Sequence, residues 1–133
     1  MCAHFVGRFL TAIVLTSAVL GVFVPSASAA GCPDIEAVLA RGTGDTPGVG
    51  WIGHAFIDSR RQKVGLKSLG VYAVDYPASE DLSRAVDGIR DAANHVESMA
   101  ANCPNTKMVL GGYSQGAAVM GFVTSTMEWS TRQ

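Results

Sequence analysis

The sequence predicts an α/β domain in which a parallel sheet lies between two layers of helices. Short runs of β-forming residues alternate with longer amphipathic runs, in the order βαβαβα. This order favours parallel strands that are joined by right-handed crossovers with helices on the faces of the sheet. Glycine-rich loops follow the first and third predicted strands, and such sheets place their binding sites at the carboxyl ends of the strands. The two loops are therefore the first places to search for a site.

Three short runs have the composition of strands. The run at 35–40 is mostly apolar and is closed by the glycine-rich loop at 41–50, which is typical of a buried strand followed by a turn. A second strand is predicted at 69–76, where Pro77 ends it. The third is predicted at 107–113.

Helical periodicity predicts helices over 51–64, 78–103 and 115–127, the second of them beginning at Ser79 or Glu80. The buried face of the first helix is expected to contain Ile52, Ala55, Phe56 and Ser59. The apolar stripe of the second is expected to contain Leu82, Val86, Ile89, Ala93, Val96 and Ala100. Three aromatic residues of these elements are more typical of a core than of a substrate groove, namely Trp51, Tyr72 and Tyr76.

The first 29 residues have the layout of an export signal. Arg8 is followed by an almost entirely apolar run at 9–24 and then by the small residues "PSASAA", which is typical of a cleavable signal peptide. The apolar run is shorter than the roughly 20 residues of a membrane span. We expect a signal peptide at 1–29, a domain at 30–133, and a secreted protein without stable membrane insertion. Cleavage after Ala30 and retention as an uncleaved anchor are the alternatives.

Charge and composition exclude several classes of partner. The 133 residues include 10 Lys and Arg against 11 Asp and Glu, a net charge of −1. No basic cluster follows the signal, so nucleic acids and anionic membrane surfaces are poor candidates as partners. No residue cluster suggests a metal or an organic cofactor.

Two cysteines, Cys32 and Cys103, remain after the expected signal. In the oxidising setting of an exported protein they have only each other to pair with, and the bridge would close a loop of about 70 residues. Two free thiols are the alternative. Neither cysteine has a histidine beside it in the sequence, so metal binding and a thiol nucleophile are not indicated.

The strongest motif is Gly112-Tyr113-Ser114-Gln115-Gly116, which fits the G-x-S-x-G nucleophile elbow and lies between a predicted strand and a predicted helix. Such a turn is sharp, so side chains at the glycines would collide with neighbouring elements while the serine is lifted into the open. The N-terminus of the following helix would favour an oxyanion nearby. A glycine-serine turn that only caps the helix is the alternative.

These residues resemble the cutinases and the bacterial cutinase-like secreted esterases, which are α/β-hydrolases. The resemblance runs from Cys32 to about Thr124 and rests on "CPDIEAVLARGTGD", "GVGWIGHAF", "GVYAVDYPAS" and "ANCPNTKMVLGGYSQGAAVM". It implies hydrolysis of carboxylic esters, such as lipids or polyesters, with Ser114 as the nucleophile. It also implies that Thr43 and the backbone N–H of Gln115 form the oxyanion hole and that Cys32 pairs with Cys103.

The sequence departs from this family after the elbow. The triad order of α/β-hydrolases is Ser, then Asp or Glu, then His, whereas Ser114 is followed only by Glu128 and by no histidine. We therefore expect a truncated member that contains only the N-terminal βαβαβα portion. A catalytically inactive remnant is the alternative to an active esterase.

The histidines that precede Ser114 in the expected domain are poor substitutes for a triad histidine. Each lies one helical turn from an aspartate on a predicted polar face, which favours a solvated i,i+4 pair over a catalytic base. The two predicted pairs are His54 with Asp58 and His95 with Asp91.

Overall fold

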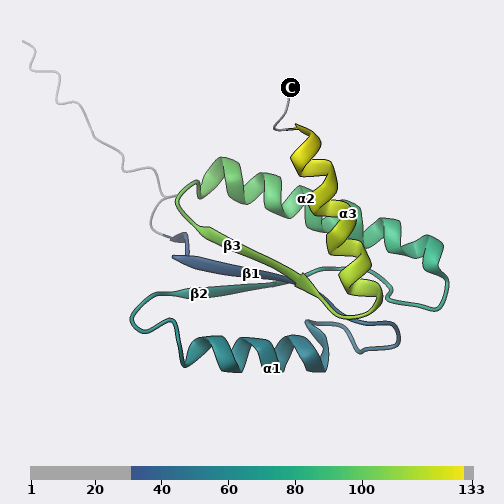
Figure 1. Cartoon of the computed structure of the whole chain (residues 1–133), viewed down its shortest axis with the longest axis horizontal. Helices are drawn as coiled ribbons and strands as arrows, with labels where there is room; N and C mark the ends of the chain where they lie inside the picture. The colour runs from purple at the N-terminus through teal and green to yellow at the C-terminus, as the bar shows by residue number, and fades with distance from the viewer. Residues whose placement is uncertain (1–30, 131–133) are drawn as a thin grey trace, which may run out of the picture.

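The computed structural model describes residues 31–130, with side chains described as far as Met127. The predicted signal peptide at 1–29 lies outside these residues. The elements follow the predicted βαβαβα order, with one added 3-10 turn (Figure 1). They are β1 (Ile35–Ala40), α1 (Gly50–Arg61), β2 (Leu69–Ala73), η2 (Leu82–Arg84), α2 (Ala85–Asn102), β3 (Lys107–Gly112) and α3 (Gln115–Ser130).

The three strands form a parallel sheet in the order β2-β1-β3, which confirms the predicted fold class. Strand β1 lies at the centre, and five of its six residues are buried. Its Ala37 lies in register between Val71 of β2 and Val109 of β3. A strand that is covered on both faces needs apolar residues at nearly every position, which explains the near-continuous apolar run of β1.

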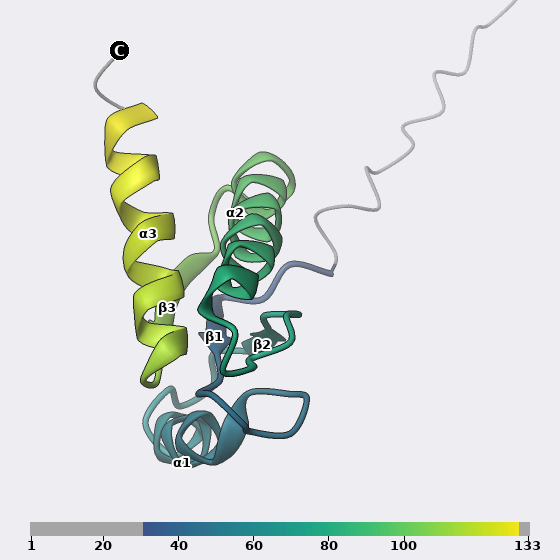
Figure 2. The same cartoon turned by 90° about the vertical axis from the view of Figure 1, so that its right-hand side faces the viewer.

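Helices cover both faces of the sheet, so the domain has three layers (Figures 1 and 2). Helix α1 lies on one face, where Ile57 and Val49 pack with Ala37 and Leu39 of β1. Helices α2 and α3 lie side by side on the other face, over the larger cluster of buried side chains. That cluster includes Val38, Val74, Tyr76, Ala92, Val96, Val119, Met120 and Val123.

Strand β2 ends at Ala73, three residues earlier than predicted. Val74 N–H still bonds to the carbonyl of Leu39, but Asp75 N–H bonds instead to the carboxylate of Asp91 on α2, at 2.8 Å. Tyr76 then turns into the core and is 4% exposed. The prediction placed Pro77 as the end of the strand, but these tertiary contacts draw the chain away from β1 before the proline.

The second helix starts later than predicted. Asp81, rather than Ser79 or Glu80, accepts the N–H of Ser83 and opens the 3-10 turn η2, after which α2 begins at Ala85. The predicted apolar stripe is therefore partly wrong, because Leu82 and Val86 are 68% and 50% exposed and Ala100 is also exposed. The stripe is confirmed at Val96, which is buried, and at Ile89 and Ala93, which pack against the same core. Gly88 and Ala92 are also buried.

The position of Tyr76 explains this shift of the buried face. A side chain at Gly88 would place its Cβ 2.9 Å from Cγ of Tyr76, so the helix packs directly on the tyrosine ring through its glycine. On α1 the prediction is wrong at Ala55, which is exposed, while Ile57 is the buried apolar residue of this helix. The predicted C-terminal end at 64 is also wrong, because α1 ends at Arg61.

A disulfide joins Cys32 to Cys103 with a sequence separation of 71, as the sequence predicted. It lies at the amino-terminal edge of the sheet, where Cys32 precedes β1 and Cys103 precedes β3. Thr106 reinforces the same junction by donating to the carbonyl of Pro33 at 2.6 Å.

Removing the bridge is expected to destabilise the domain. In the chain-entropy account, opening a loop of this length costs about 4 kcal/mol of the free energy of unfolding. Urea titration of the Cys32→Ser/Cys103→Ser variant beside the wild-type chain, with and without reductant, measures the difference. Coincident transitions for oxidised wild type and variant would contradict this expectation.

Two helical glycines provide a matched test of the packing on Tyr76. Gly88→Ala is expected to lower the free energy of unfolding by about 1–3 kcal/mol, because the added methyl group overlaps the buried ring. Gly121→Ala on α3 meets nothing within 4 Å and is expected to gain up to about 1 kcal/mol of helix propensity. Urea unfolding of both variants measures this contrast, and equal shifts in the same direction would refute the packing argument.

Candidate active site

Ser114 lies in the turn between β3 and α3 and has a backbone φ of +53°. A positive φ is uncommon for a residue other than glycine and marks a strained turn. The serine is exposed, while the adjacent Gln115 is buried. Sequence and backbone therefore agree on a sharp strand-to-helix elbow that presents the serine hydroxyl to solvent.

The two outer glycines of the elbow are required by close backbone approaches. A Cβ on Gly116 would overlap the carbonyl of Ala40 at the end of β1. A Cβ on Gly112 would overlap the backbone of Gly116 and come within 2.7 Å of the nitrogen of Ala117. These contacts place the start of α3 directly against the carboxyl end of β1.

The loop after β1 contacts this elbow through the side chain of Gln115, which is 7% exposed. Thr43 Oγ1 donates to Gln115 Oε1 at 3.3 Å, and Gln115 Nε2 donates to the carbonyl of Ser79 at 3.2 Å. One buried amide thus links three segments that are far apart in the sequence. The structure therefore brings Thr43, Ser114 and Gln115, the three predicted site residues, to one edge of the sheet.

The loop at 41–45 is held in a tight shape by Asp45. The carboxylate of Asp45 accepts a hydrogen bond from the backbone N–H of Gly42 at 3.1 Å. The backbone N–H of Asp45 donates to the carbonyl of Gly42 at 3.2 Å. Gly44 N–H donates to the carbonyl of Ala78 at 2.8 Å. Ala78 has a φ of +49° and is almost fully buried, so this second strained residue lies in the segment that supports the Thr43 loop.

Arg41, the first residue after β1, is a buried cation that the sequence analysis missed. It is 4% exposed, and its guanidinium donates to the carbonyls of Val74 and Tyr76. The hydroxyl of Tyr76 donates back to the carbonyl of Arg41. Burial raises the pKa of Tyr76, an effect that the nearby guanidinium opposes in part, so the phenol stays protonated and remains a donor at neutral pH.

This exchange of hydrogen bonds fixes the base of the Thr43 loop against the segment after β2. Buried polar groups need hydrogen-bond partners. Here the side chains of Arg41 and Tyr76 each donate to the backbone carbonyl of the other residue. The guanidinium carbon also lies 5.1 Å from the centroid of the Tyr76 ring, within the range of a cation–π contact. The sequence signal that could have indicated a buried role for Arg41 is its position directly after an apolar strand and before a glycine-rich loop.

The predicted surface pair of His95 with Asp91 is wrong. His95 stacks on Tyr72 with ring centroids 3.5 Å apart, and its Nε2 lies 3.3 Å from Oε2 of Glu36 on β1. Asp91 accepts a hydrogen bond from the hydroxyl of Tyr72 at 3.1 Å. The pKa of Tyr72 is raised mainly by burial and, to a smaller extent, by this hydrogen bond. Both α2 residues therefore face the sheet, because each of them contacts Tyr72 of β2.

Neither histidine of the described residues contacts the elbow. Glu36 is the second residue of β1, so His95 contacts the amino-terminal half of the sheet, whereas Ser114 lies at its carboxyl edge. His54 is exposed on α1, as is Asp58. Glu128 lies in α3 beyond the described side chains.

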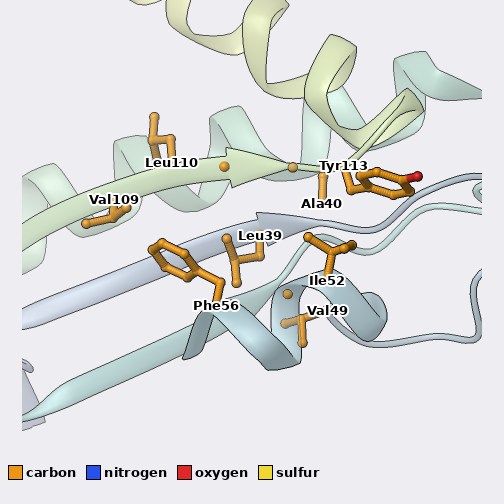
Figure 3. A pocket seen from close by; sticks show the side chains of 11 residues that line it. Leu39, Ala40, Val49, Ile52, Phe56, Val109, Leu110 and Tyr113 are labelled. Atoms are coloured by element: carbon orange, nitrogen blue, oxygen red, sulfur yellow. The ribbon is translucent and has the colours of Figure 1, made fainter. Parts of the chain in front are cut away.

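An apolar groove of about 210 Å³ ends beside the elbow, between α1 and β3 (Figure 3). Tyr113 lies at the end of this groove nearest Ser114 and makes an edge-on contact with Trp51, with ring centroids 6.1 Å apart. Trp51 is 65% exposed, so it is a surface residue, whereas Tyr76 belongs to the core as expected. The groove is lined by Leu39, Ala40, Val49, Ile52, Gly53, Phe56, Val109, Leu110, Gly111, Gly112 and Tyr113.

Within residues 31–130, no group of three or more His, Cys, Asp or Glu side chains is placed to hold a metal ion. None of the helices in this part of the chain is both long and apolar enough to cross a membrane.

Comparison with known proteins agrees with the sequence resemblance. The chain is 53% identical over 117 residues to a Mycobacterium tuberculosis protein named "Probable carboxylesterase Culp3", which covers 88% of this chain and 44% of that protein. It is 55% identical to "Phospholipase Culp4" of the same species, over 76% of this chain and 44% of the relative. The chain thus spans about half the length of these relatives.

Solved structures show the same fold. A Trichoderma reesei cutinase in complex with a phosphonate inhibitor superposes with a TM-score of 0.66 at 44% identity, covering 71% of this chain and 45% of that one. The catalytic core of an acetyl xylan esterase from the same fungus superposes with a TM-score of 0.56 at 28% identity, covering 66% and 46%. The cutinase family profile matches residues 31–133. By sequence and by fold, the chain belongs to the cutinase family of α/β-hydrolases.

Proposed function

We propose that Ser114 is the nucleophile of a carboxylic-ester hydrolase. The observation that carries this proposal is the elbow itself, where an exposed serine with positive φ lies between a parallel strand and a helix. A turn that only capped the helix would need neither the strained backbone nor the two close glycine contacts. In the proposed reaction the serine oxygen attacks the ester carbonyl, the alcohol leaves, and water then releases the acid from the acyl-serine.

Thr43 and Gln115 are the proposed oxyanion donors. Gln115 is the first residue of α3, so its N–H has no carbonyl within the helix to bond, whereas the next three N–H groups donate to the carbonyls of Tyr113 and Ser114. Thr43 Oγ1 lies 3.3 Å from Gln115 Oε1, which keeps this hydroxyl beside the elbow, and its proton would turn from the amide oxygen to the substrate oxygen in the reaction. Preorganised donors of this kind stabilise the charge that develops on the carbonyl oxygen.

The proton acceptor for Ser114 is proposed to come from residues outside the described part of the chain. In α/β-hydrolases the acid and the histidine follow the serine in the sequence, and neither of the two described histidines contacts the elbow. Full catalysis therefore needs a general base that residues 31–130 do not supply.

The proposed substrates are esters with an apolar acyl part, such as lipids or polyesters. The names of the Culp3 and Culp4 relatives, a carboxylesterase and a phospholipase, support this class. The exposed rings of Trp51 and Tyr113 offer apolar surface close to the elbow.

Export from the cell is part of the proposal. The disulfide between Cys32 and Cys103 supports an oxidising destination. The expected signal at 1–29 and the domain at 30–133 agree with it.

A non-catalytic secreted protein of the same fold is the second candidate. The position of His95 favours it, since this histidine is engaged with Tyr72 and Glu36 rather than with the serine. The two candidates differ in whether Ser114 reacts.

We expect the purified chain to be labelled at Ser114 by a fluorophosphonate ester probe. Because no described histidine faces the serine, hydrolysis of a chromogenic short-chain ester should be only a residual activity, about 10³–10⁴-fold above the uncatalysed rate. Mass spectrometry of the labelled peptide and initial rates measure both. Ser114→Ala should abolish labelling, and Ser125→Ala, an exposed serine of α3, should retain it. Equal labelling of folded wild type and Ser114→Ala would reject the nucleophile and leave the non-catalytic candidate.

Thr43→Val is expected to slow phosphonylation of Ser114 by about 10²-fold, because one oxyanion donor is lost. Thr46→Val provides the control, since Thr46 is an exposed threonine of the same loop. Time courses of labelling compare the variants at equal concentration. Equal rates for the two variants would show that Thr43 is not a donor to the reacting oxygen.

A further inference from the structure

Arg41 is a buried cation that is not paired with a carboxylate. It is 4% exposed, and none of the ion pairs among the described side chains includes it. Burying a charge without an opposite charge is costly, and an apolar side chain of similar volume often packs at least as well. The cost of burying this charge points to a role other than filling space.

Each nitrogen of the guanidinium donates to a different backbone carbonyl. Nε donates to Asp45 at 3.1 Å, Nη1 donates to Val74 at 3.5 Å, and Nη2 donates to Tyr76. Asp45 ends the loop that Arg41 begins, whereas Val74 and Tyr76 belong to the segment after β2. One planar group therefore ties the two ends of the loop at 41–45 together and attaches them to that segment. Lysine lacks this fixed, planar set of donors.

The segment after β2 contacts both halves of the site. The carbonyl of Ala78 accepts a hydrogen bond from the N–H of Gly44 at 2.8 Å. The carbonyl of Ser79 accepts one from the side-chain amide of Gln115 at 3.2 Å. Ala78 is 1% exposed and has a φ of +49°, a conformation that persists only where the surroundings impose it. The two carbonyls thus have fixed directions, one toward the Thr43 loop and one toward the elbow.

Thr43 lies where these contacts converge. It precedes Gly44, and its hydroxyl lies 3.3 Å from Oε1 of Gln115, the residue that follows Ser114. The side chain of Thr43 is exposed, so apolar packing does not fix it. Its place relative to Ser114 therefore depends on the hydrogen bonds of its own loop and of the segment after β2. Arg41 binds both of them.

We propose that Arg41 is a positioning residue of the oxyanion hole, and that its guanidinium keeps the Thr43 hydroxyl where it donates to the reacting oxygen. Arg41 acts only through Thr43, because its buried guanidinium is occupied by backbone carbonyls. Donors stabilise a developing charge best when they are held in place before the reaction. The effect on the reaction rests on the proposed function of Ser114 and Thr43, whereas the effect on the loop does not.

The first test measures the loop in Arg41→Lys. Arg61→Lys is the matched control, because Arg61 is exposed at the end of α1. In NMR hydrogen exchange, the Gly44 amide should exchange at least about tenfold faster in Arg41→Lys than in wild type, relative to the amides of β1, because buried hydrogen bonds to a charged group are lost. Arg61→Lys should match wild type. Equal exchange in the two variants would overturn the proposal.

The second test measures the rate at which the fluorophosphonate ester probe labels Ser114. Arg41→Lys should slow labelling about tenfold, because small displacements of a reacting group are costly, and Arg61→Lys should not slow it. In a chain that already carries Thr43→Val, Arg41→Lys should slow labelling less than about twofold, because the group through which it acts is absent. Equal slowing in both backgrounds would assign Arg41 a general structural role and overturn the positioning role.

Tyr76→Phe keeps the test decisive if Arg41→Lys does not fold. This variant retains the buried ring and removes only the hydroxyl that donates to the carbonyl of Arg41. Labelling should slow about threefold, the effect of one hydrogen bond, and only where Thr43 is present. Circular dichroism checks that the variant is folded. The same slowing in the Thr43→Val background would contradict the proposal.

The two tests separate this inference from the proposed function. Faster exchange of Gly44 in Arg41→Lys, in a protein whose Ser114 is never labelled, would support the hold of Arg41 on the loop and refute the nucleophile. Labelling of Ser114 at the same rate in wild type and in folded Arg41→Lys would retain the nucleophile and overturn the positioning role.

Discussion

The contact between Gly116 and the carbonyl of Ala40 is the constraint on which the site depends. Because residue 116 has no side chain, α3 begins directly against the end of the central strand. This approach sets the direction of the turn and leaves Ser114 with a positive φ in the open. It also brings the N-terminus of α3 beside the loop that leaves β1. The absence of a side chain at residue 116 therefore allows the elbow to contact the Thr43 loop.

Around this contact, buried polar groups hold the loops in place where no regular structure does. The Gln115 amide joins the Thr43 loop to Ser79, and Arg41 exchanges hydrogen bonds with Tyr76. Each group is almost fully buried, so loss of a partner would leave a desolvated donor or acceptor. The site edge is therefore ordered by a few specific hydrogen bonds, whereas the layers behind it are ordered by apolar packing.

The parts of this architecture that local patterns encode could be predicted from the sequence. A few neighbouring residues are enough to predict the buried strand β1 and the G-x-S-x-G turn. The disulfide follows from the presence of only two cysteines after the expected signal. The roles of Arg41 and Tyr76 could not be predicted in this way, because they arise from a contact across 35 positions. The same reason explains the errors on α2. Its helical period predicted a stripe that is right at Ile89, Ala93 and Val96. The ring of Tyr76 under Gly88 and the stacking of His95 on Tyr72 add other residues to the buried face, which the period alone does not indicate.

The disulfide lies at the opposite end of the sheet from the serine. It fastens the segment before β1 to the segment before β3 with a covalent bond, while the carboxyl edge is held only by packing and hydrogen bonds. The two ends of the strands are thus secured by different chemistry. A reducing environment therefore breaks its bond at the end remote from Ser114, and it reaches the reactive edge only through the stability of the domain as a whole.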